Sequence, residues 1–413
     1  MSEFINNNAA RIDSLLQFCL DLIKGKNGKD LIESHQEAID HLCPNDIIQV
    51  VHKLVEEDLP MDDLKIGINK SLNVFHNLII AHEKPKVDSN HFLGILMQEN
   101  RALEKRLGEI KPLVKSFNKA ETEDDLKKDL GEIHSRIEEF AEFEKHYSRK
   151  ENIFFPYFEN QYPEYKCLGV MWSIHDDIRR LRKELLQALA NEQADLKLIN
   201  KLIGDLFFLK YTIIFREEFL LFPVALNALS SDLWYEMNQQ SLEVGFSFID
   251  PPVFTPDQKS KKSKSFLFEG KELDAKQLGN TLLNFDTGLM TLDQAMMLLN
   301  HLPVDITMID ENDRVRFFSN PKDRFFTRSK AIIGRTVQNC HPPESVHIVD
   351  ELLKAFRSGA KDSEPFWIQM QDRFILIQYF ALRDDEGNYK GCIEVSQDLT
   401  DLKNLEGEKR LME

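Results

Sequence analysis

The chain has 413 residues, of which 42% are hydrophobic and 29% are charged, and it carries a formal net charge of -17. A chain of this length holds two to four domains, each able to bury a core, and the composition is that of a soluble globular protein. The acidic balance argues against nucleic-acid binding, which normally uses a basic face.

The sequence also disfavours membrane insertion, secretion and disulfide bonding. No apolar run approaches the roughly 20 residues that span a bilayer, and the N-terminal segment lacks the basic start and apolar stretch of a secretory signal. The five cysteines are scattered and lack CxxC spacing, which is typical of reduced thiols. We therefore expect an acidic cytoplasmic protein that does not enter a membrane.

The first predicted region covers residues 1–82 and is all-α. The segments LLQFCLDLI and IIQVVHKLV place apolar residues at helical spacing, and Cys43-Pro44-Asn45-Asp46 between them is a plausible helix stop followed by a helix cap. Nothing in this region indicates catalysis.

Residues 83–245 are expected to form the second region. Apolar residues at three-four spacing predict long helices over about 90–117, 123–156, 165–191 and 194–228. The loops between them are short enough for antiparallel neighbours, so we predict an up-down four-helix bundle.

Two segments of this bundle echo each other. HYSRKENIFFP ends at Pro156 and IIFREEFLLFP ends at Pro223. When the prolines are aligned, Glu151 falls opposite Glu218. A carboxylate among so many apolar side chains is costly to bury unless something compensates its charge. A metal ion held by facing helices is one such compensation.

The candidate ligands are histidines and acids distributed over these helices. His91 starts the first helix, His146 lies in the second, and His175 faces the interior of the third. Lys150 rather than an acid stands four residues after His146, and a residue five positions on is rotated by roughly 140°. Imidazole and carboxylate together suit iron, zinc or manganese. The alternative is that these residues are buried and hydrogen-bonded without a metal.

The remaining chain divides into a linker, a third domain and a tail. Residues 246–289 contain prolines and the basic run KSKKSK, which is typical of a solvated linker. Residues 290–403 contain a hairpin signal in VDITMIDENDRVRFFSN, then helices, then three alternating segments, which predicts an α+β domain with an antiparallel sheet. Residues 404–413 form a C-terminal tail.

Residues 83–245 resemble the hemerythrin-like, HHE cation-binding family of four-helix bundles. The motifs that carry this resemblance are HYSRKENIFFP, MWSIHDDIRR and FREEFLLFPVAL. The family holds a non-haem di-iron centre that responds to oxygen, nitric oxide or iron status. Matched position by position, the resemblance implies metal ligands at His91, His146, His175 and an acid at Glu217 or Glu218. With the displaced acid of the second helix, the candidate metal ligands are His91, His146, Glu151, His175, Glu217 and Glu218.

The chain departs from the family pattern at two positions. Ile213 replaces the histidine of the fourth helix, and the acid of the second helix is displaced to Glu151, with Lys150 where a ligand would stand. The resemblance therefore leaves three alternatives, which are a di-iron centre, a mononuclear site, and a bundle that kept the fold and lost the metal.

Residues 290–403 resemble a PAS domain, through LPVDITMIDENDRVRFFSN at the start and GCIEVSQDLTDLK at the end. Asp398-Leu399-Thr400 matches the signal with which the last PAS strand leads to an output helix. PAS domains are small ligand-binding or dimerising modules. Haem-binding members carry an axial histidine on the long helix before the last three strands, and His347 stands there. The alternative for His347 is a packed or solvent-facing histidine, which is more common on a helix than a haem ligand.

The N-terminal region resembles an uncharacterised helical domain that often precedes such bundles, although the usual Cys-x-x-His pattern is absent because Asn73 stands three residues before His76. The three resemblances together imply a sensor or regulatory protein whose bundle binds iron and responds to oxygen, nitric oxide or redox state. The PAS domain would mediate a homodimer or dock a separate effector protein.

No kinase, P-loop or helix-turn-helix motif follows the PAS segment, so we expect no enzyme activity of those kinds. The alternatives are a di-iron protein that repairs iron centres or reduces a small oxidant, and a metal-free adaptor.

Overall fold

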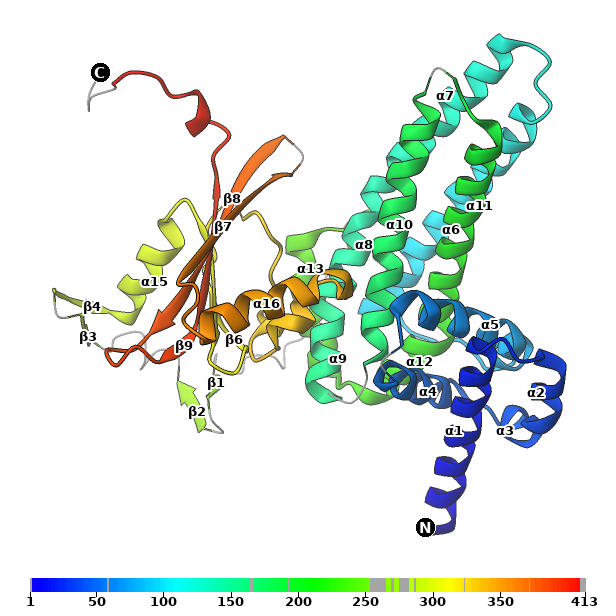
Figure 1. Cartoon of the computed structure of the whole chain (residues 1–413), viewed down its shortest axis with the longest axis horizontal. Helices are drawn as coiled ribbons and strands as arrows, with labels where there is room; N and C mark the ends of the chain where they lie inside the picture. The colour runs from blue at the N-terminus through cyan, green and yellow to red at the C-terminus, as the bar shows by residue number, and fades with distance from the viewer. Residues whose placement is uncertain are drawn as a thin grey trace. The chain divides into compact units, whose positions relative to one another are not determined.

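The computed structural model describes residues 2–57, 59–162, 166–191, 193–252, 265–268, 271–274, 282–285, 287–322, 324–370 and 372–408. The chain divides into a first compact unit of residues 1–254 with 342–344, and a second of residues 255–341 with 345–413 (Figure 1). The basic run KSKKSK lies outside the described residues.

The first unit begins with the predicted N-terminal helices. They are α1 (Ser2–Ile23), α2 (Gly28–Ser34), α3 (Gln36–Asp40), α4 (Pro44–Glu56) and α5 (Met61–Ile80). The predicted break before α4 is present, since the Asp46 carboxylate accepts a hydrogen bond from the Cys43 backbone N–H at 2.9 Å. That bond satisfies one of the free N–H groups at the start of the helix.

The bundle follows, and its long helices lie side by side in Figure 1. Its elements are α6 (Phe92–Phe117), α7 (Glu123–Glu139), the short 3₁₀ turn η1 (Phe140–Phe143), α8 (Glu144–Arg149), the π-helical turn η2 (Lys150–Phe154), α9 (Phe155–Gln161), α10 (Cys167–Leu189), α11 (Leu196–Arg216), the π-helical turn η3 (Glu217–Leu221), α12 (Phe222–Ala228) and α13 (Ser231–Val244).

The N-terminal helices and the bundle share one apolar core, which runs from Ile12 to Met237. A buried ion pair between Lys65 of α5 and Asp177 of α10 also joins them, with 2.6 Å between the ammonium nitrogen and the carboxylate. The predicted boundary near residue 82 therefore lies inside a continuously packed unit.

The echoing prolines do not end their helices. Pro156 and Pro223 each stand in the first turn of a new helix, α9 and α12. Proline is tolerated in the first turn of a helix, and each of these prolines follows a π-helical turn. The prediction that the second helix stops at Pro156 is therefore wrong, since the helical path continues to Gln161.

One glycine of α6 is required by close packing. A Cβ atom on Gly94 would lie 2.1 Å from the backbone carbonyl oxygen of Asp88. Gly94→Ala should therefore displace the segment before α6 and lower the free energy of unfolding by about 1–3 kcal/mol. Chemical denaturation followed by circular dichroism would measure the change.

Gly108 of the same helix is the matched control. It is exposed, and a Cβ atom there would meet nothing within 4 Å. Gly108→Ala should raise the free energy of unfolding by about 0.5–1 kcal/mol, because alanine loses less backbone entropy in a helix. Equal effects of the two substitutions would show that Gly94 is not constrained as described.

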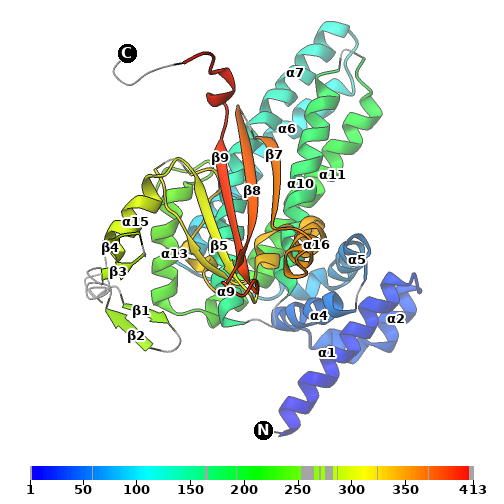
Figure 2. The same cartoon turned by 60° about the vertical axis from the view of Figure 1, so that its left-hand side comes forward.

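The second unit is built on a five-stranded antiparallel sheet of order β6-β5-β9-β8-β7 (Figure 2). Its strands are β5 (Asp305–Asp310), β6 (Val315–Phe318), β7 (Ser363–Met370), β8 (Arg373–Arg383) and β9 (Tyr389–Asp398). Helix α16 (Val346–Arg357) packs against this sheet through Leu353 and Phe356. The predicted hairpin and the three final strands are all present.

The chain before this sheet also contains short elements. Two strand pairs form, β1 (Ser265–Phe268) with β2 (Lys271–Asp274) and β3 (Leu282–Asn284) with β4 (Leu289–Thr291), and α15 (Leu292–His301) follows. The segment predicted as a linker thus has strand structure in the parts that the structure describes. Among all described residues, no helix is long and apolar enough to cross a membrane.

Candidate functional site: a buried ionic cluster in the bundle

The echoing segments place two π-helical turns at equivalent positions. The wide turns η2 and η3 begin at Lys150 and Glu217, which are also the residues that align when the two prolines are superposed. In each turn a backbone N–H bonds to the carbonyl five residues before, from Phe155 to Lys150 and from Phe222 to Glu217. Such turns occur frequently at functional sites.

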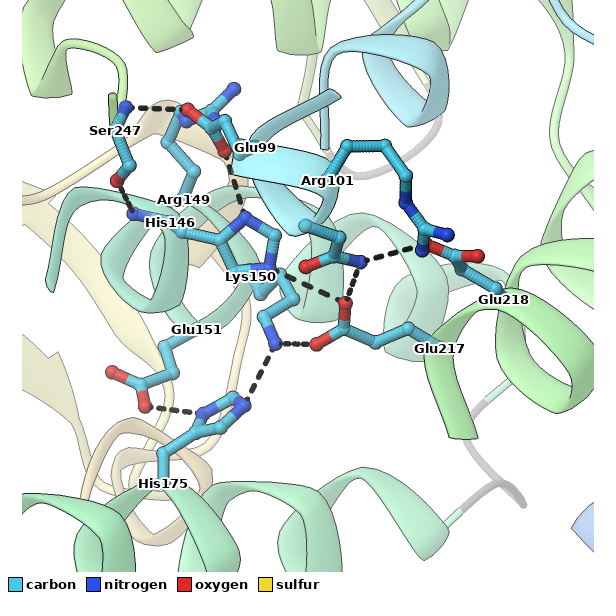
Figure 3. Close-up of polar contacts among 11 residues, drawn as sticks. Glu99, Arg101, His146, Arg149, Lys150, Glu151, His175, Glu217, Glu218 and Ser247 are labelled. Carbon is cyan, nitrogen blue, oxygen red and sulfur yellow. Dashed lines mark hydrogen bonds and ion pairs between the residues drawn. The ribbon is translucent and has the colours of Figure 1, made fainter. Parts of the chain in front are cut away.

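The first residues of the two turns meet in the core as an ion pair. Lys150 donates to the carboxylate of Glu217, and both side chains are fully buried (Figure 3). Burial alone would raise the pKa of Glu217, but the charges of Lys150 and His146 lower it below its ordinary value. Glu217 is therefore an anion inside the apolar core.

His175 connects the same lysine to Glu151. Its Nε2 lies 2.9 Å from Nζ of Lys150, and its Nδ1 lies 2.7 Å from a carboxylate oxygen of Glu151. An ammonium group only donates and a carboxylate only accepts, so the proton of the ring is on Nδ1. Burial, followed by the charge of Lys150, lowers the pKa of His175 well below its ordinary value, which keeps the ring neutral.

His146 lies between two buried acids. Its Nδ1 is 2.8 Å from Glu99 and its Nε2 is 3.3 Å from Glu217. Both partners are carboxylates, so each ring nitrogen faces an oxygen that can only accept a hydrogen bond. Glu99 also accepts from the guanidinium of Arg149 and, at 2.6 Å, from the backbone N–H of Ser247.

The outer acids have cations of their own. Arg179 donates to Glu151 at 2.9 Å, while Arg101 and Lys84 both donate to Glu218. The amide of Asn100 bridges the two acids of η3, at 2.8 Å from Glu217 and 3.2 Å from Glu218. Every buried carboxylate of this cluster is thus paired with at least one lysine or arginine.

These donors do not fit a metal centre as they stand. The Nε2 lone pair of His175 already accepts a proton from Lys150, and both nitrogens of His146 face carboxylates. The guanidinium Nε and Nη1 of Arg149 lack a hydrogen-bond partner in the described structure, but they are donors and cannot ligate a cation. No group of three or more His, Cys, Asp and Glu side chains among the described residues could hold a metal ion.

The structure brings together five of the six predicted ligands and separates the sixth. His146, Glu151, His175, Glu217 and Glu218 all take part in the cluster. His91 instead caps α6, where its Nδ1 accepts from the Leu93 backbone N–H at 3.2 Å and its ring lies 4.9 Å from that of Trp234. The assignment of His91 as a ligand therefore gains no support, because its Nδ1 serves the helix terminus.

Several members of the cluster were not identified from the sequence. Glu99 and Asn100 are fully buried on α6, and Arg149 is fully buried on α8. A signal existed for the first two, since they stand between Leu96 and Leu103 in an otherwise apolar helical stripe. Polar residues at such positions need buried partners.

A second buried lysine lies beside the cluster without joining its ion pairs. Lys210 is fully buried on α11, and its ammonium group sits over three aromatic rings at 4.9, 5.3 and 5.7 Å, those of Phe140, Phe143 and Tyr147. Burial lowers the pKa of Lys210 from 10.5 to about 7, while Glu144 opposes the shift and Arg182 and Lys150 add to it.

This shift makes the effect of Lys210→Met depend on pH. Between pH 7 and 10.5 the unfolded chain keeps the proton that folded Lys210 has lost, so the wild type gains stability as pH rises. The free energy of unfolding of Lys210→Met should exceed that of the wild type by an amount that decreases by about 1.4 kcal/mol per pH unit over this range. Urea denaturation at pH 7.5 and 9.5 would measure it, with exposed Lys201→Met as the matched control. If the free energies of unfolding of Lys210→Met and the wild type differ by the same amount at both pH values, the expectation is wrong.

The second unit contains a cavity of about 740 Å³ between the sheet and α16. Apolar residues such as Ile309, Val349 and Leu352 line it, and Tyr379 and Glu394 add polar groups. Burial and the neighbouring Glu394 raise the pKa of Tyr379, which keeps its hydroxyl protonated. This composition is typical of small-molecule sites.

The predicted haem ligand does not reach this cavity. His347 is exposed on the first turn of α16 and is not among the lining residues. His341 does line the cavity, but its Nδ1 lies 2.8 Å from the backbone carbonyl of Val337. The haem prediction for His347 therefore gains no support from the structure.

Comparison with known families agrees with two of the three resemblances. Residues 91–225 match the family described as hemerythrin HHE cation binding domain, and residues 296–400 match a PAS domain family. No curated protein matches the chain.

Solved structures similar to the chain cover parts of it. The C-terminal domain of a Streptococcus mutans protein has 29% identity and a TM-score of 0.30, over 31% of this chain and 99% of its own. A PAS domain from Colwellia psychrerythraea has 18% identity and a TM-score of 0.22, over 27% and 98%. A PAS domain from Bordetella pertussis has 20% identity and a TM-score of 0.22, over 27% and 96%.

Proposed function

We propose that this chain, which contains a hemerythrin HHE domain and a PAS domain, is a signalling protein whose PAS domain binds a small molecule. The observation that carries the proposal is the cavity of about 740 Å³, since its size and its mainly apolar lining are those of ligand sites. The ligand would be largely apolar, with a polar group placed near Tyr379 and Glu394.

The output of such a protein would pass through contacts between proteins. A PAS domain commonly mediates dimerisation or contact with an effector. In this proposal, the PAS domain of the chain forms a homodimer or binds a separate effector protein. The bound ligand would shift the population of two arrangements only if it binds one of them more tightly than the other.

A fluorescent probe of apolar cavities tests the ligand site in the full chain. Anilinonaphthalene sulfonate should gain fluorescence on binding, and Val349→Trp should reduce that gain, because the new ring occupies part of the cavity. Leu298→Trp, on an exposed position of α15, is the matched control and should bind the probe as the wild type does. Equal probe binding by Val349→Trp would refute the proposed site.

The match to a cation-binding family favours a second function, in which the bundle binds a metal ion. The metal in this family is typically iron. In this alternative the bundle binds iron and responds to oxygen, nitric oxide or redox state. Its ligands would come from the cluster, and Lys150 would first have to leave His175 and Glu217. Absorbance spectra of the iron-supplemented protein, reduced, in air and with nitric oxide, test it. Spectra that do not differ among the three conditions would exclude this alternative.

A further inference from the structure

We propose that Lys150 is the resident cation of the bundle, and that its ammonium group holds the place between His175 and Glu217 that a metal ion would need. The inference concerns the first unit only and does not depend on the role of the PAS domain. It follows from three independent features of the cluster.

The first feature is the internal symmetry of the two echoing halves. Lys150 and Glu217 occupy the same position in their segments, each at the start of a π-helical turn, and they face each other across the core. Two acids at these positions would repel each other and would need a bound cation. A base at one of them removes that need.

The second feature is the geometry of the ammonium group. Its partners are an imidazole lone pair, Nε2 of His175, and a carboxylate oxygen of Glu217. These are the donor types that bind zinc, iron and manganese. Glu151 fixes the ring by accepting from Nδ1 at 2.7 Å, which is how an outer acid orients a metal-binding histidine. The lysine thus uses a site that is arranged for a cation.

The third feature is the charge balance around the site. Glu99 is paired with Arg149, Glu151 with Arg179, and Glu218 with Arg101 and Lys84. No buried carboxylate of the cluster is left to attract a further cation. A divalent ion added to this arrangement would also meet the positive charges of Lys150 and Arg149, which are fully buried.

Metal content and metal-dependent stability test the inference in the full chain. The protein is grown with iron, zinc or manganese and purified without chelators, and metals per chain are counted by mass spectrometry. Thermal melting is then recorded with each metal and with a chelator. We expect less than about 0.1 metal per chain and a melting temperature that changes by less than about 1 °C. One or two metals per chain that His175→Gln removes would overturn the inference.

Lys150→Glu provides the converse test. It replaces the ammonium group by a carboxylate, so the cluster loses its cation and gains a ligand. We expect the variant to melt at a lower temperature than the wild type and to recover at least about 5 °C when one of the three metals is added. Lys145→Glu makes the same charge change at a partly exposed position of α8 and should show no metal dependence.

If the Lys150→Glu protein folds and none of the three metals raises its melting temperature, this position is not a cation site and the inference is overturned. If the variant does not fold, the metal content of the wild type decides the question alone.

Discussion

Lys150→Met should lower the free energy of unfolding by about 3–5 kcal/mol, because it leaves the Glu217 carboxylate in the core without its cation. Both side chains are fully buried, so water cannot replace the lost partner. Urea denaturation of the full chain, followed by circular dichroism of the helices, would measure the loss.

A double variant separates the charge effect from loss of packing. Lys150→Met combined with Glu217→Gln removes both charges, so its destabilisation should be clearly smaller than the sum of the two single effects. Lys145→Met, on the preceding helix α8, is the control, since its partly exposed pair with Glu142 is worth at most about 1 kcal/mol. Strict additivity of the two buried substitutions would show that Lys150 and Glu217 do not form the described pair.

Phe154→Ala should be destabilising by about 3–5 kcal/mol, since it removes a fully buried ring from the centre of the aromatic core. Its ring lies within 6.2 Å of the rings of Phe92, Phe155, Phe158, Phe222 and Trp234. Phe154 ends the turn η2, so the same substitution should also loosen the pairing of Lys150 with Glu217.

Phe208→Ala is the control for this substitution. Phe208 lies on α11 with 47% of its surface exposed, and its replacement should cost less than about 1 kcal/mol. The same denaturation experiment compares the two. A cost for Phe154→Ala that is no greater than that for Phe208→Ala would contradict the described packing.

The main elements could be predicted from the sequence because periodicity and turn residues report local structure. The helices predicted over 90–117 and 165–191 are found at Phe92–Phe117 and Cys167–Leu189. The hairpin of the PAS domain was signalled by its polar turn, where Asp313 adopts a φ of 62°. Asparagine and aspartate tolerate this conformation better than most residues.

The site could be predicted only in part, because its arrangement depends on tertiary partners. The echo singled out Glu217 and Glu218, which both lie in the cluster. Regular helix geometry, however, put His146 and Glu151 on different faces. The π-helical turn that begins at Lys150 changes this local geometry. No residue type in HYSRKENIFFP predicts such a turn. The role of Lys150 follows from Glu217, which lies on a different helical segment.

His91 is a predicted ligand to which the structure gives another role. A histidine at a helix start can match the metal-ligand position of a family pattern or can cap the helix. The sequence alone does not distinguish these two roles. In the structure, Nδ1 of His91 accepts a hydrogen bond from the Leu93 backbone N–H. Helix starts need such acceptors, since their first N–H groups have no helical partner.

The position of the buried cation can be observed directly by X-ray diffraction. Crystals of the full chain, grown from iron-supplemented protein, are measured at the iron absorption edge. We expect no anomalous peak in the cluster, and density for the Lys150 ammonium group within hydrogen-bond distance of His175 Nε2 and Glu217. An anomalous peak within about 2.3 Å of His175 Nε2, with Lys150 turned away, would contradict the assignment of Lys150 as the resident cation.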